Sequence, residues 1–536
     1  PSQFRPIITN GTHPSTGRLY RNDWNDSLKH PYFTNVSKEA GITIEGYGHA
    51  ATVADFNQDG WKDIYVSNDF LSCDILYINN RDGTFTDQAR RYFKHTSANS
   101  MGQDVEDINN DGLEDVMVLD MDPEDNNRKK TMLSPANYRT YQNSDYYGYQ
   151  YQYVRNTLQL NQGPRACAND SSGAPVFSDI SFMAGVAETD WSWTPLVADF
   201  DRDGYKDMII TNGFPKDITD RDFMSFRRDA YSVATKQQLL EQIPEVKLKN
   251  YAYRNGHDLR FSDVTGEWGL TEPSFSNGAV YADLDNDGDL DVVVNNINEE
   301  AFVYENTLSG AAAHYLGVRF KGGAHNVNGI GAFATVYYNH SQKQVYENNP
   351  YRGYLSSLAA MAYFGLGDTA TIDSLVIRWA PSKKQVIKNV KTDQVITVDI
   401  ANANEADSWD QPLVNPYFRD VTAQAGINYT HRETDYIDFD RERLIPHKLS
   451  QFGPALSAGD INGDGLDDIC IGGSAKYPGS FLVQQRDGKF TEQPMPVAAT
   501  GKYENMGLLL FDADNDGDLD LYCASGSNEF PANTAA

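Results

Sequence analysis

Short apolar segments of strand length recur along the chain, and several of them directly follow a stretch of acidic residues. Three examples are Ile64-Tyr65-Val66, Met208-Ile209-Ile210 and Val292-Val293-Val294. Short apolar runs bounded by turn residues are typical of buried β-strands. The segments before the acidic stretches are also strand-like, often with a glycine five to seven residues upstream of the first aspartate. The pattern therefore predicts repeated units of strand, acidic loop and strand.

Each acidic stretch is a nine-residue loop, and the chain contains six of them. Every loop has Asp at position 1, Asn or Asp at position 3, Asp at position 5, Gly at position 6 and Asp at position 9. Ca²⁺ takes about six to eight oxygen ligands, and a glycine lets a short loop bend around the ion. We expect side-chain oxygens from positions 1, 3, 5 and 9 and a backbone carbonyl from position 7. The alternative is an acidic hairpin turn that binds no metal. The candidate ligands of these six sites are Asp55, Asn57, Asp59, Trp61, Asp63, Asp107, Asn109, Asp111, Leu113, Asp115, Asp199, Asp201, Asp203, Tyr205, Asp207, Asp283, Asp285, Asp287, Asp289, Asp291, Asp460, Asn462, Asp464, Leu466, Asp468, Asp512, Asp514, Asp516, Asp518 and Asp520.

Position 12 of the loops excludes the EF-hand, which needs a bidentate Glu there and helices on both sides. No loop has a Glu at that position, where the residues are Val66, Val118, Ile210, Val294, Ile471 and Cys523. Dockerin modules use similar loops but continue into helices, whereas these loops run into strands. The predicted calcium is therefore structural and fixes a turn between two strands.

A second pattern completes each unit. A hairpin signal such as Arg81-Asp82-Gly83 precedes a Phe-x-Asp marker such as Phe85-Thr86-Asp87, and Asp-Gly is a strong signal for a tight hairpin. Similar markers occur at Phe33, Phe177, Phe261, Phe418 and Phe490. Each unit thus contains four short strands, and the first two loops begin 52 residues apart. Units of this length and content are typical of β-propeller blades.

Two longer intervals between loops contain insertions. Residues 121–152 are polar and rich in tyrosine, and residues 217–250 have a helix-forming composition. Both are expected to decorate one face of a propeller. The tyrosines fit either a stacking platform for sugar or peptide, or packing of the insertion onto the blades. Packing between blades is also the expectation for Trp191 and Trp193.

The repeats are interrupted once, which suggests four regions. We expect an all-β chain with a first propeller in residues 1–307, incomplete at its N-terminus, and a small β domain in residues 308–400. A polar linker in residues 401–416 precedes the start of a second propeller in residues 417–536. Four acidic loops precede residue 308 and only two follow it, whereas a closed propeller has about four to eight blades. The sequence therefore predicts that the chain is a fragment, or that blades are missing at both ends.

Charge and composition narrow the function. The net charge is −30, and the six loops contribute 25 acidic and three basic residues. Without metal these carboxylates repel one another, so the metal-free protein should be less stable. The acidic balance argues against nucleic-acid binding, which needs a basic surface. No apolar run reaches the ~20 residues of a membrane helix. Four scattered cysteines do not make a disulfide scaffold. Cys470 and Cys523 are expected as buried free thiols, with a pairing between them left open.

These motifs resemble known families. The six Asp-rich repeats resemble the FG-GAP/VCBS calcium-binding blades of integrin-α-type propellers. Residues 328–332, 353–357, 363–367 and 376–379 look like the ASPIC/UnbV domain, which accompanies such repeats in the cartilage acidic protein family and its bacterial relatives. The resemblance implies a secreted or cell-surface protein without catalysis. Large bacterial members are similar to lipoproteins associated with SusC/SusD-like outer-membrane uptake systems.

Three functions follow from these observations. The first is a calcium-stabilised surface protein that recognises a protein or glycan, as an accessory subunit of an outer-membrane uptake or adhesion complex. The second is a propeller enzyme acting on polysaccharide, such as a glycosidase or lyase. The third is a structural spacer. The sequence contains no nucleophile elbow, zinc-binding helix or phosphate loop. We therefore expect a binding protein rather than an enzyme.

Overall fold

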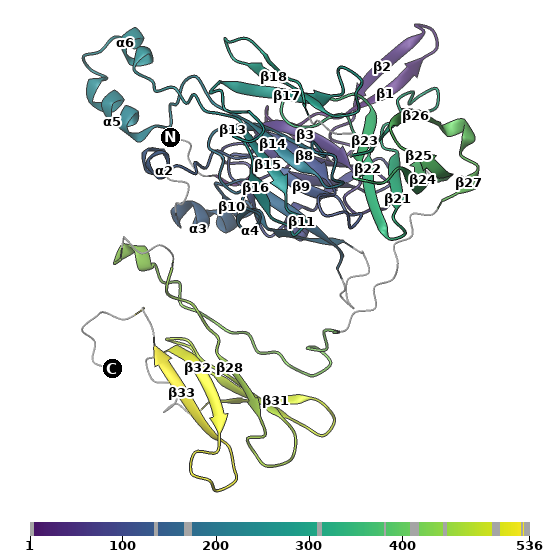
Figure 1. Ribbon diagram of the computed structural model, residues 1–536. Coiled ribbons are helices and arrows are strands. Elements are labelled where there is room, and N and C mark those ends of the chain that lie inside the picture. Colours follow the sequence, from purple (N-terminus) through teal and green to yellow (C-terminus); the bar gives the residue numbers. More distant parts are fainter. Residues whose placement is uncertain are drawn as a thin grey trace. The chain divides into compact units, whose positions relative to one another are not determined.

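The computed structural model describes residues 5–132, 138–165, 174–307, 313–379, 382–407, 418–442, 448–495, 504–526 and residue 529. Most of the regular structure consists of β-strands, which confirms the predicted predominance of β-structure (Figure 1). The described residues fall into two compact units, one ending at residue 407 and the other starting at residue 418. No closed propeller is seen in the described parts of the chain.

The first unit contains a series of antiparallel sheets, one for each of the first four acidic loops. The first sheet comprises β3 (Gly48–Ala54), β4 (Asp63–Asn68), β5 (Ile75–Asn79) and β6 (Phe85–Asp87). The second comprises β8 (Gln103–Glu106), β9 (Asp115–Val118), β11 (Thr157–Pro164) and β12 (Pro175–Asp179). The third comprises β13 (Ser192–Ala198), β14 (Asp207–Asn212), β15 (Tyr251–Asn255) and β16 (Phe261–Asp263). The fourth comprises β17 (Ser276–Ala282), β18 (Asp291–Asn296) and β19 (Phe302–Tyr304).

Consecutive sheets pack face to face, and the innermost strands β3, β8, β13 and β17 are neighbours in that order. Their buried side chains form one apolar layer between each pair of sheets. Phe56 and Tyr65 of the first sheet meet Phe177 of the second, and Leu158 of the second meets Tyr253 of the third. The predicted strand–loop–strand–hairpin unit is therefore present. Strands such as β9, β13 and β14 are buried along their whole length, because their sheets are covered on both faces.

Helices lie in the insertions and between the strands. The described helices are α1 (Ala89–Tyr92), α2 (Asn126–Thr131), α3 (Tyr138–Tyr147), α4 (Ser181–Ala184), α5 (Arg221–Ala230) and α6 (Lys236–Glu241). Asp220 caps α5 by accepting from the Phe223 N–H at 2.7 Å, and Thr235 begins α6 with a capping box. Both lie in the 217–250 insertion, where the composition favours helix.

The two tryptophans of the third sheet are buried, as their predicted packing role requires. The Trp191 ring stacks on Phe214 with centroids 4.6 Å apart, and the Trp193 ring lies 5.0 Å from that of Tyr354. The tyrosine-rich insertion has no single role, because Tyr149 is buried whereas Tyr146 is exposed. The first unit also contains two short strand pairs, β1 (Tyr20–Asn25) with β2 (His30–Asn35) and β7 (Thr96–Ser97) with β10 (Gln152–Tyr153).

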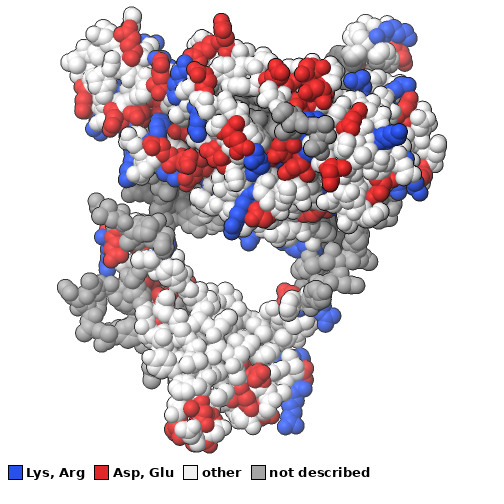
Figure 2. All heavy atoms as spheres, in the orientation of Figure 1, with Lys and Arg blue, Asp and Glu red and all other residues white. Residues whose placement is uncertain are grey.

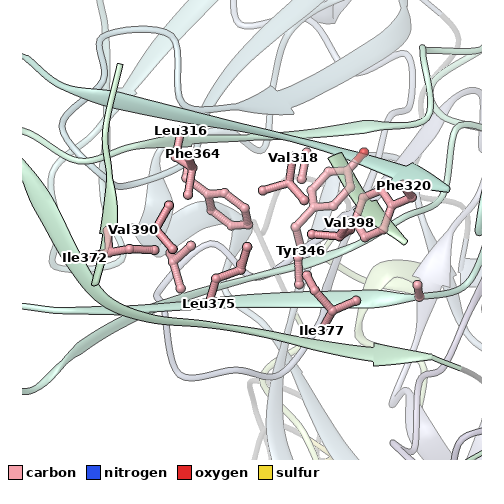
Figure 3. Close-up of a cluster of buried hydrophobic side chains, with 14 of the residues drawn as sticks. Leu316, Val318, Phe320, Tyr346, Phe364, Ile372, Leu375, Ile377, Val390 and Val398 are labelled. Atoms are coloured by element: carbon pink, nitrogen blue, oxygen red, sulfur yellow. The ribbon is translucent and has the colours of Figure 1, made fainter. Parts of the chain in front are cut away.

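A small β domain follows the fourth sheet and belongs to the same compact unit. One sheet comprises β20 (Tyr315–Lys321), β23 (Met361–Gly365) and β26 (Gln394–Asp399). The other comprises β21 (Phe333–Tyr338), β22 (Gln342–Glu347), β24 (Thr371–Trp379), β25 (Lys383–Lys391) and β27 (Glu405–Ala406). Figure 3 shows side chains of the two sheets, including Phe364 and Leu375, facing one another across one apolar core. A 3-10 turn at Ile400–Asn402 follows β26.

The predicted linker begins inside this domain, since Glu405 pairs with Lys384 of β25. Its remaining residues from 408 to 416 lie outside the described residues. The second unit contains a 3-10 turn at Asp438–Asp440 and the last two acidic loops. Its strands are β28 (Leu456–Gly459), β29 (Asp468–Ile471), β30 (Ser480–Gln484), β31 (Phe490–Pro494), β32 (Glu504–Phe511) and β33 (Asp520–Gly526). Figure 2 shows acidic atoms gathered where the β32–β33 hairpin turns.

The described cysteines are free thiols. Cys73 and Cys470 are buried, and Cys523 is half-buried. Burial raises the pKa of Cys470 to about 11, so the thiol stays protonated at neutral pH. Cys167 lies outside the described residues. No helix among the residues with assigned structure is long and apolar enough to cross a membrane.

Candidate metal centres

The six acidic loops connect the first and second strands of their sheets, and position 9 is the first residue of the outgoing strand in each. Position 1 folds the loop over itself. In the first loop the Asp55 carboxylate accepts from the Asp59 N–H at 2.9 Å and from the Gly60 N–H at 2.8 Å. The same pair of hydrogen bonds recurs in the loops that begin at Asp107, Asp199, Asp460 and Asp512. This fold brings positions 1, 3 and 5 together at the turn.

Position 9 has a structural role that the sequence did not indicate, because its carboxylate accepts hydrogen bonds from two separate backbone segments. The Asp63 carboxylate accepts from the Phe56 N–H at 3.2 Å and from the Asn79 N–H at 2.8 Å. It thereby joins the start of the loop to the third strand of the sheet. Equivalent pairs form at Asp115, Asp207, Asp291 and Asp468. The predicted ligand role of position 9 remains a prediction beside this structural role.

An asparagine at the end of the third strand was missed from the sequence. The Asn255 side-chain amide donates to the Lys206 carbonyl and to the Ile108 carbonyl, both at 2.9 Å. It so ties the third loop to the second. Asn79, Asn161 and Asn306 occupy the same place. The signal was available, because this residue falls 15 or 16 residues after position 9 in the loops that have no insertion, at Asn79, Asn306 and Gln484.

Position 4 was also missed. Its backbone is left-handed in all six loops, with φ of 53° at Gln58, 61° at Asn110 and Arg202, 64° at Asn286, 75° at Gly463 and 62° at Asn515. Asn and Gly tolerate this conformation best, and together they fill four of these positions. The side chain reaches the next loop, since Gln58 donates to the Gly112 carbonyl at 2.5 Å and Asn110 donates to the Gly204 carbonyl at 2.9 Å. Neighbouring loops are therefore linked.

The chemistry of the loops fits a hard cation. Three loops bring three carboxylates together with ligand oxygens within 4.8 Å of one another, namely Asp199 with Asp201 and Asp203, Asp283 with Asp285 and Asp287, and Asp512 with Asp514 and Asp520. The other three loops have Asn at position 3, which offers an amide oxygen instead. The position 7 residues donate their N–H to the position 5 carboxylate, as Trp61 does to Asp59 at 2.8 Å. The ligand role of the position 7 carbonyl stays a prediction.

The fourth loop shows most directly that a partner is needed. Among the described residues, no hydrogen-bond partner is found for the buried Oδ1 of Asp283 or for either carboxylate oxygen of Asp289. A buried carboxylate without a partner is costly. A cation at this turn would supply the missing partner, so the residues present fit a metal ion of the kind that prefers oxygen ligands.

The pKa values of buried carboxylates in the first and third loops indicate the same need. Burial raises the pKa of Asp55 to about 7, that of Asp63 to about 8 and that of Asp199 to about 7. Neighbouring carboxylates contribute, because like charges at close range disfavour ionisation. Without a cation, the folded chain therefore retains protons on these groups near neutral pH.

The small β domain contacts each of the four loops of the first unit. At the first loop, the Lys62 ammonium lies 2.5 Å from the Glu347 carboxylate, which also accepts from the Asp55 N–H at 3.0 Å. At the second, the Lys343 ammonium donates to the Asp111 carbonyl. At the third, the Gly367 N–H donates to the Arg202 carbonyl at 3.0 Å. At the fourth, a Cβ on Gly288 would lie 2.0 Å from the Tyr315 ring.

A buried ion cluster fixes the centre of this contact. The Arg352 guanidinium, from the small domain, lies 3.0 Å from the Asp104 carboxylate and 2.5 Å from the Glu106 carboxylate, both on β8. The Arg352 side chain is 1 % exposed. Its guanidinium also lies over the Tyr346 ring, 5.2 Å from the centroid. Burial raises the pKa of Glu106 to about 7 although Arg352 opposes the shift.

Comparison with known proteins supports the two motif assignments. A family profile for the ASPIC and UnbV domain matches residues 322–405, and one for an FG-GAP-like repeat matches residues 460–523. The phosphatidylinositol-glycan-specific phospholipase D of Mus musculus is 32 % identical over 102 residues, which cover 17 % of this chain. The match spans only 12 % of the length of that relative.

Among solved structures, an Agrocybe aegerita lectin that recognises non-reducing terminal N-acetylglucosamine aligns over 92 % of this chain and 90 % of its own. The identity is 13 % and the TM-score is 0.26, so this likeness carries no weight for fold or ligand. The two profile matches, in contrast, coincide with the small β domain and with the acidic loops of the second unit. The chain therefore contains an ASPIC/UnbV domain and an FG-GAP-like repeat, which confirms the resemblance of its motifs.

Proposed function

We propose that this chain is a calcium-stabilised binding protein of the extracellular type. The metal ions hold the repeat sheets and the ASPIC/UnbV domain together, and an exposed insertion meets a partner protein or glycan. The observation that carries this proposal is that all four acidic loops of the first unit contact the ASPIC/UnbV domain. Calcium binding at the loops would thereby stabilise the whole unit and not the loops alone.

Calcium is favoured over other metals by the ligand chemistry. The loops offer carboxylate, amide and carbonyl oxygens, whereas thiol and imidazole ligands, which favour zinc or copper, are absent from all six loop sequences. Mg²⁺ prefers a near-ideal octahedron and keeps several waters, whereas a flexible nine-residue loop suits the larger ion. The match to an FG-GAP-like repeat also favours calcium, because such repeats commonly bind this ion. We propose about six sites in the chain.

The binding surface is assigned to the helical insertion. Helices α5 and α6 are held by caps, and the turn between them exposes two large side chains, with Tyr231 78 % and Val233 84 % exposed. Phe226 and Leu240 are exposed beside them. Exposed apolar groups on an ordered element are typical of interaction sites. The partner class is a protein or a glycan.

The setting and the partner complex follow from the motif families. We propose a cell-surface location and, in a bacterium, a lipoprotein at the outer membrane beside a SusC/SusD-like uptake or adhesion complex. No catalytic role is proposed. The hydrolase activity named for the mouse phospholipase D belongs to a protein of which this chain matches 12 %, and it is not carried over.

Metal content tests the calcium part of the proposal. The full chain, dialysed against calcium and then against calcium-free buffer, should retain close to six calcium ions per chain by mass spectrometry. Asp199→Ala should lower the count by one, because Asp199 holds position 1 of the third loop. Asp26→Ala, which changes an acidic residue outside the loops, should leave the count unchanged. Equal counts in all three proteins would contradict the assignment.

Binding to a panel of glycans and surface proteins tests the second part. Tyr231→Ser should weaken any interaction found, whereas Tyr146→Ser, at an equally exposed tyrosine of the other insertion, should not. If both variants bind as the parent does, the insertion 217–250 is not the contact surface. If the chain binds nothing on the panel but retains its metal, the structural-spacer alternative is favoured.

A further inference from the structure

The fourth sheet lacks one strand. The first three sheets each end in a Phe-x-Asp strand, namely β6, β12 and β16, which pairs with the third strand of its sheet. In the fourth sheet, β19 holds the third place and β18 is its one partner among the described residues. After Thr307 the sequence continues into the ASPIC/UnbV domain without a Phe-x-Asp marker.

Val303 of β19 is exposed because no fourth strand covers it among the described residues. Val303 is 65 % exposed. Alignment of the sheets through their third strands gives Leu76, Leu158 and Ala252 as its counterparts, and each of them is 0 % exposed. In those sheets, the residue after the marker Asp donates its N–H to the carbonyl of the counterpart, as Gln88 does to Leu76 at 2.8 Å. By analogy with these counterparts, the Val303 carbonyl on the exposed edge of β19 is available to accept a hydrogen bond from an added strand.

A pocket lies where the marker phenylalanine would go. In the third sheet Phe261 is buried between the second and third sheets, beside Ile108 and Tyr253. The corresponding space between the third and fourth sheets is a cavity of about 310 Å³. Its lining includes Phe200 and Tyr304, which occupy the places of Ile108 and Tyr253. The buried hydroxyl of Tyr304 has no hydrogen-bond partner in the part of the chain that the structure describes.

The register of the absent strand can be written down. In the first sheet Asn79 faces the marker Phe85 and Tyr77 faces the marker Asp87. In the fourth sheet, Asn306 takes the place of Asn79, since its N–H donates to the position 9 carboxylate of Asp291 at 2.9 Å as that of Asn79 does to Asp63. An added strand would therefore place Phe opposite Asn306 and over the pocket, Asp opposite Tyr304, and an apolar residue against Val303.

We propose that the edge of β19 is a docking site for an extended Phe-x-Asp-apolar strand presented by a separate polypeptide. An exposed strand edge offers unpaired backbone groups, and a peptide that adds a strand gains backbone hydrogen bonds for affinity and a side-chain pocket for specificity. The first unit has no spare strand of this kind among its described residues, because β6, β12 and β16 complete their own sheets and β2 pairs with β1.

The sequence supplies the probe. Residues 418–427 read Phe-Arg-Asp-Val-Thr-Ala-Gln-Ala-Gly-Ile, form no strand, and leave Phe418 91 % exposed. A labelled peptide of this sequence, added to the full chain in calcium, should bind saturably by fluorescence anisotropy. The same peptide with Phe418→Ala should bind at least about tenfold more weakly, because the phenyl ring fills the pocket.

Two variants at one position locate the site. Val303→Pro removes the outward N–H of β19 and should abolish binding. Val303→Thr keeps that backbone N–H and a β-branched side chain, so it should bind the peptide as the parent does. Unchanged calcium content and near-ultraviolet circular dichroism would show that both variants are folded. Equal binding by Val303→Pro and the parent would overturn the proposal.

A third variant tests whether the chain's own Phe418 segment already occupies the β19 edge. The Phe418→Ala chain should bind the peptide as tightly as the parent. If neither protein binds the peptide, β19 is not an acceptor edge and the proposal fails. If only the Phe418→Ala chain binds it, residues of the chain itself compete for the edge, and the assignment to a separate polypeptide is overturned.

Discussion

Replacing Arg352 by methionine gives the sharpest test of how the ASPIC/UnbV domain is held. The side chain is 1 % exposed and pairs with Asp104 at 3.0 Å and Glu106 at 2.5 Å, and both carboxylates are as deeply buried. Methionine keeps the apolar packing but leaves two buried carboxylates without their cation. Removing one partner of a buried ion pair costs about 3–5 kcal/mol. We therefore expect the free energy of unfolding of the first unit to fall by about that amount.

The matched control is a surface pair of the same chemistry. Arg21 lies 2.8 Å from Asp23, and its side chain is 64 % exposed. Exposed pairs are screened by solvent and contribute little, so Arg21→Met should leave the free energy of unfolding nearly unchanged. Urea unfolding followed by tryptophan fluorescence suits both variants, because six of the seven tryptophans lie in the described residues of the first unit.

The pH dependence of this variant separates charge from packing. Burial raises the pKa of Glu106 to about 7 even with Arg352 present, and loss of the guanidinium raises it further. The folded variant then binds a proton that the unfolded chain, with an ordinary Glu pKa, releases. Its stability should therefore rise as the pH falls from above 7 toward the ordinary Glu pKa of 4.5. The deficit against the parent should be largest at pH 8 and smaller at pH 5.5. A deficit below 1 kcal/mol at pH 8, or one independent of pH, would refute the buried ion cluster.

Three further outcomes are expected. Gly288→Ala should lower the melting temperature, because a Cβ would lie 2.0 Å from the Tyr315 ring and φ is 93°, whereas Gly323→Ala meets nothing within 4 Å and should not. Asn255→Leu should cost about 2 kcal/mol in urea unfolding, because two hydrogen bonds to loop carbonyls are lost. In chelator, the Asp63 carboxyl has a pKa of about 8 in the folded chain, whereas in the unfolded chain it loses its proton near pH 4. The folded state binds more protons across that window, so stability in chelator should decrease as the pH rises from about 4 through 8, and the melting-temperature gain from calcium should be larger at pH 8 than at pH 5.

The repeat and the candidate ligands were predictable from the sequence for a physical reason. Strand periodicity and the fixed spacing of Asp and Gly are local signals, and they recur in every loop from Asp55 to Asp520. The left-handed position 4 and the third-strand asparagine, as at Asn110 and Asn255, are equally local. Both features become visible once the six repeats are aligned.

The docking of the ASPIC/UnbV domain was not predictable in this way. Its contacts join residues far apart in sequence, such as Asp55 with Glu347 and Asp104 with Arg352. No periodicity or short spacing marks such pairs, and a charged residue such as Arg352 is usually expected at the surface. The sequence boundary at residues 307 and 308 therefore marks a change of repeat type, while both sides of it pack into one compact unit.

A thermal melt of the full chain in excess calcium and in chelator would show whether calcium stabilises the first unit. We expect a large fall of the melting temperature on chelation, reversed by added calcium, because the loops carry most of the net charge of −30 and contact the ASPIC/UnbV domain in the first unit. Identical melting temperatures under the two conditions, with no metal bound to the chain, would contradict it. The acidic loops would then be turns held by their own hydrogen bonds.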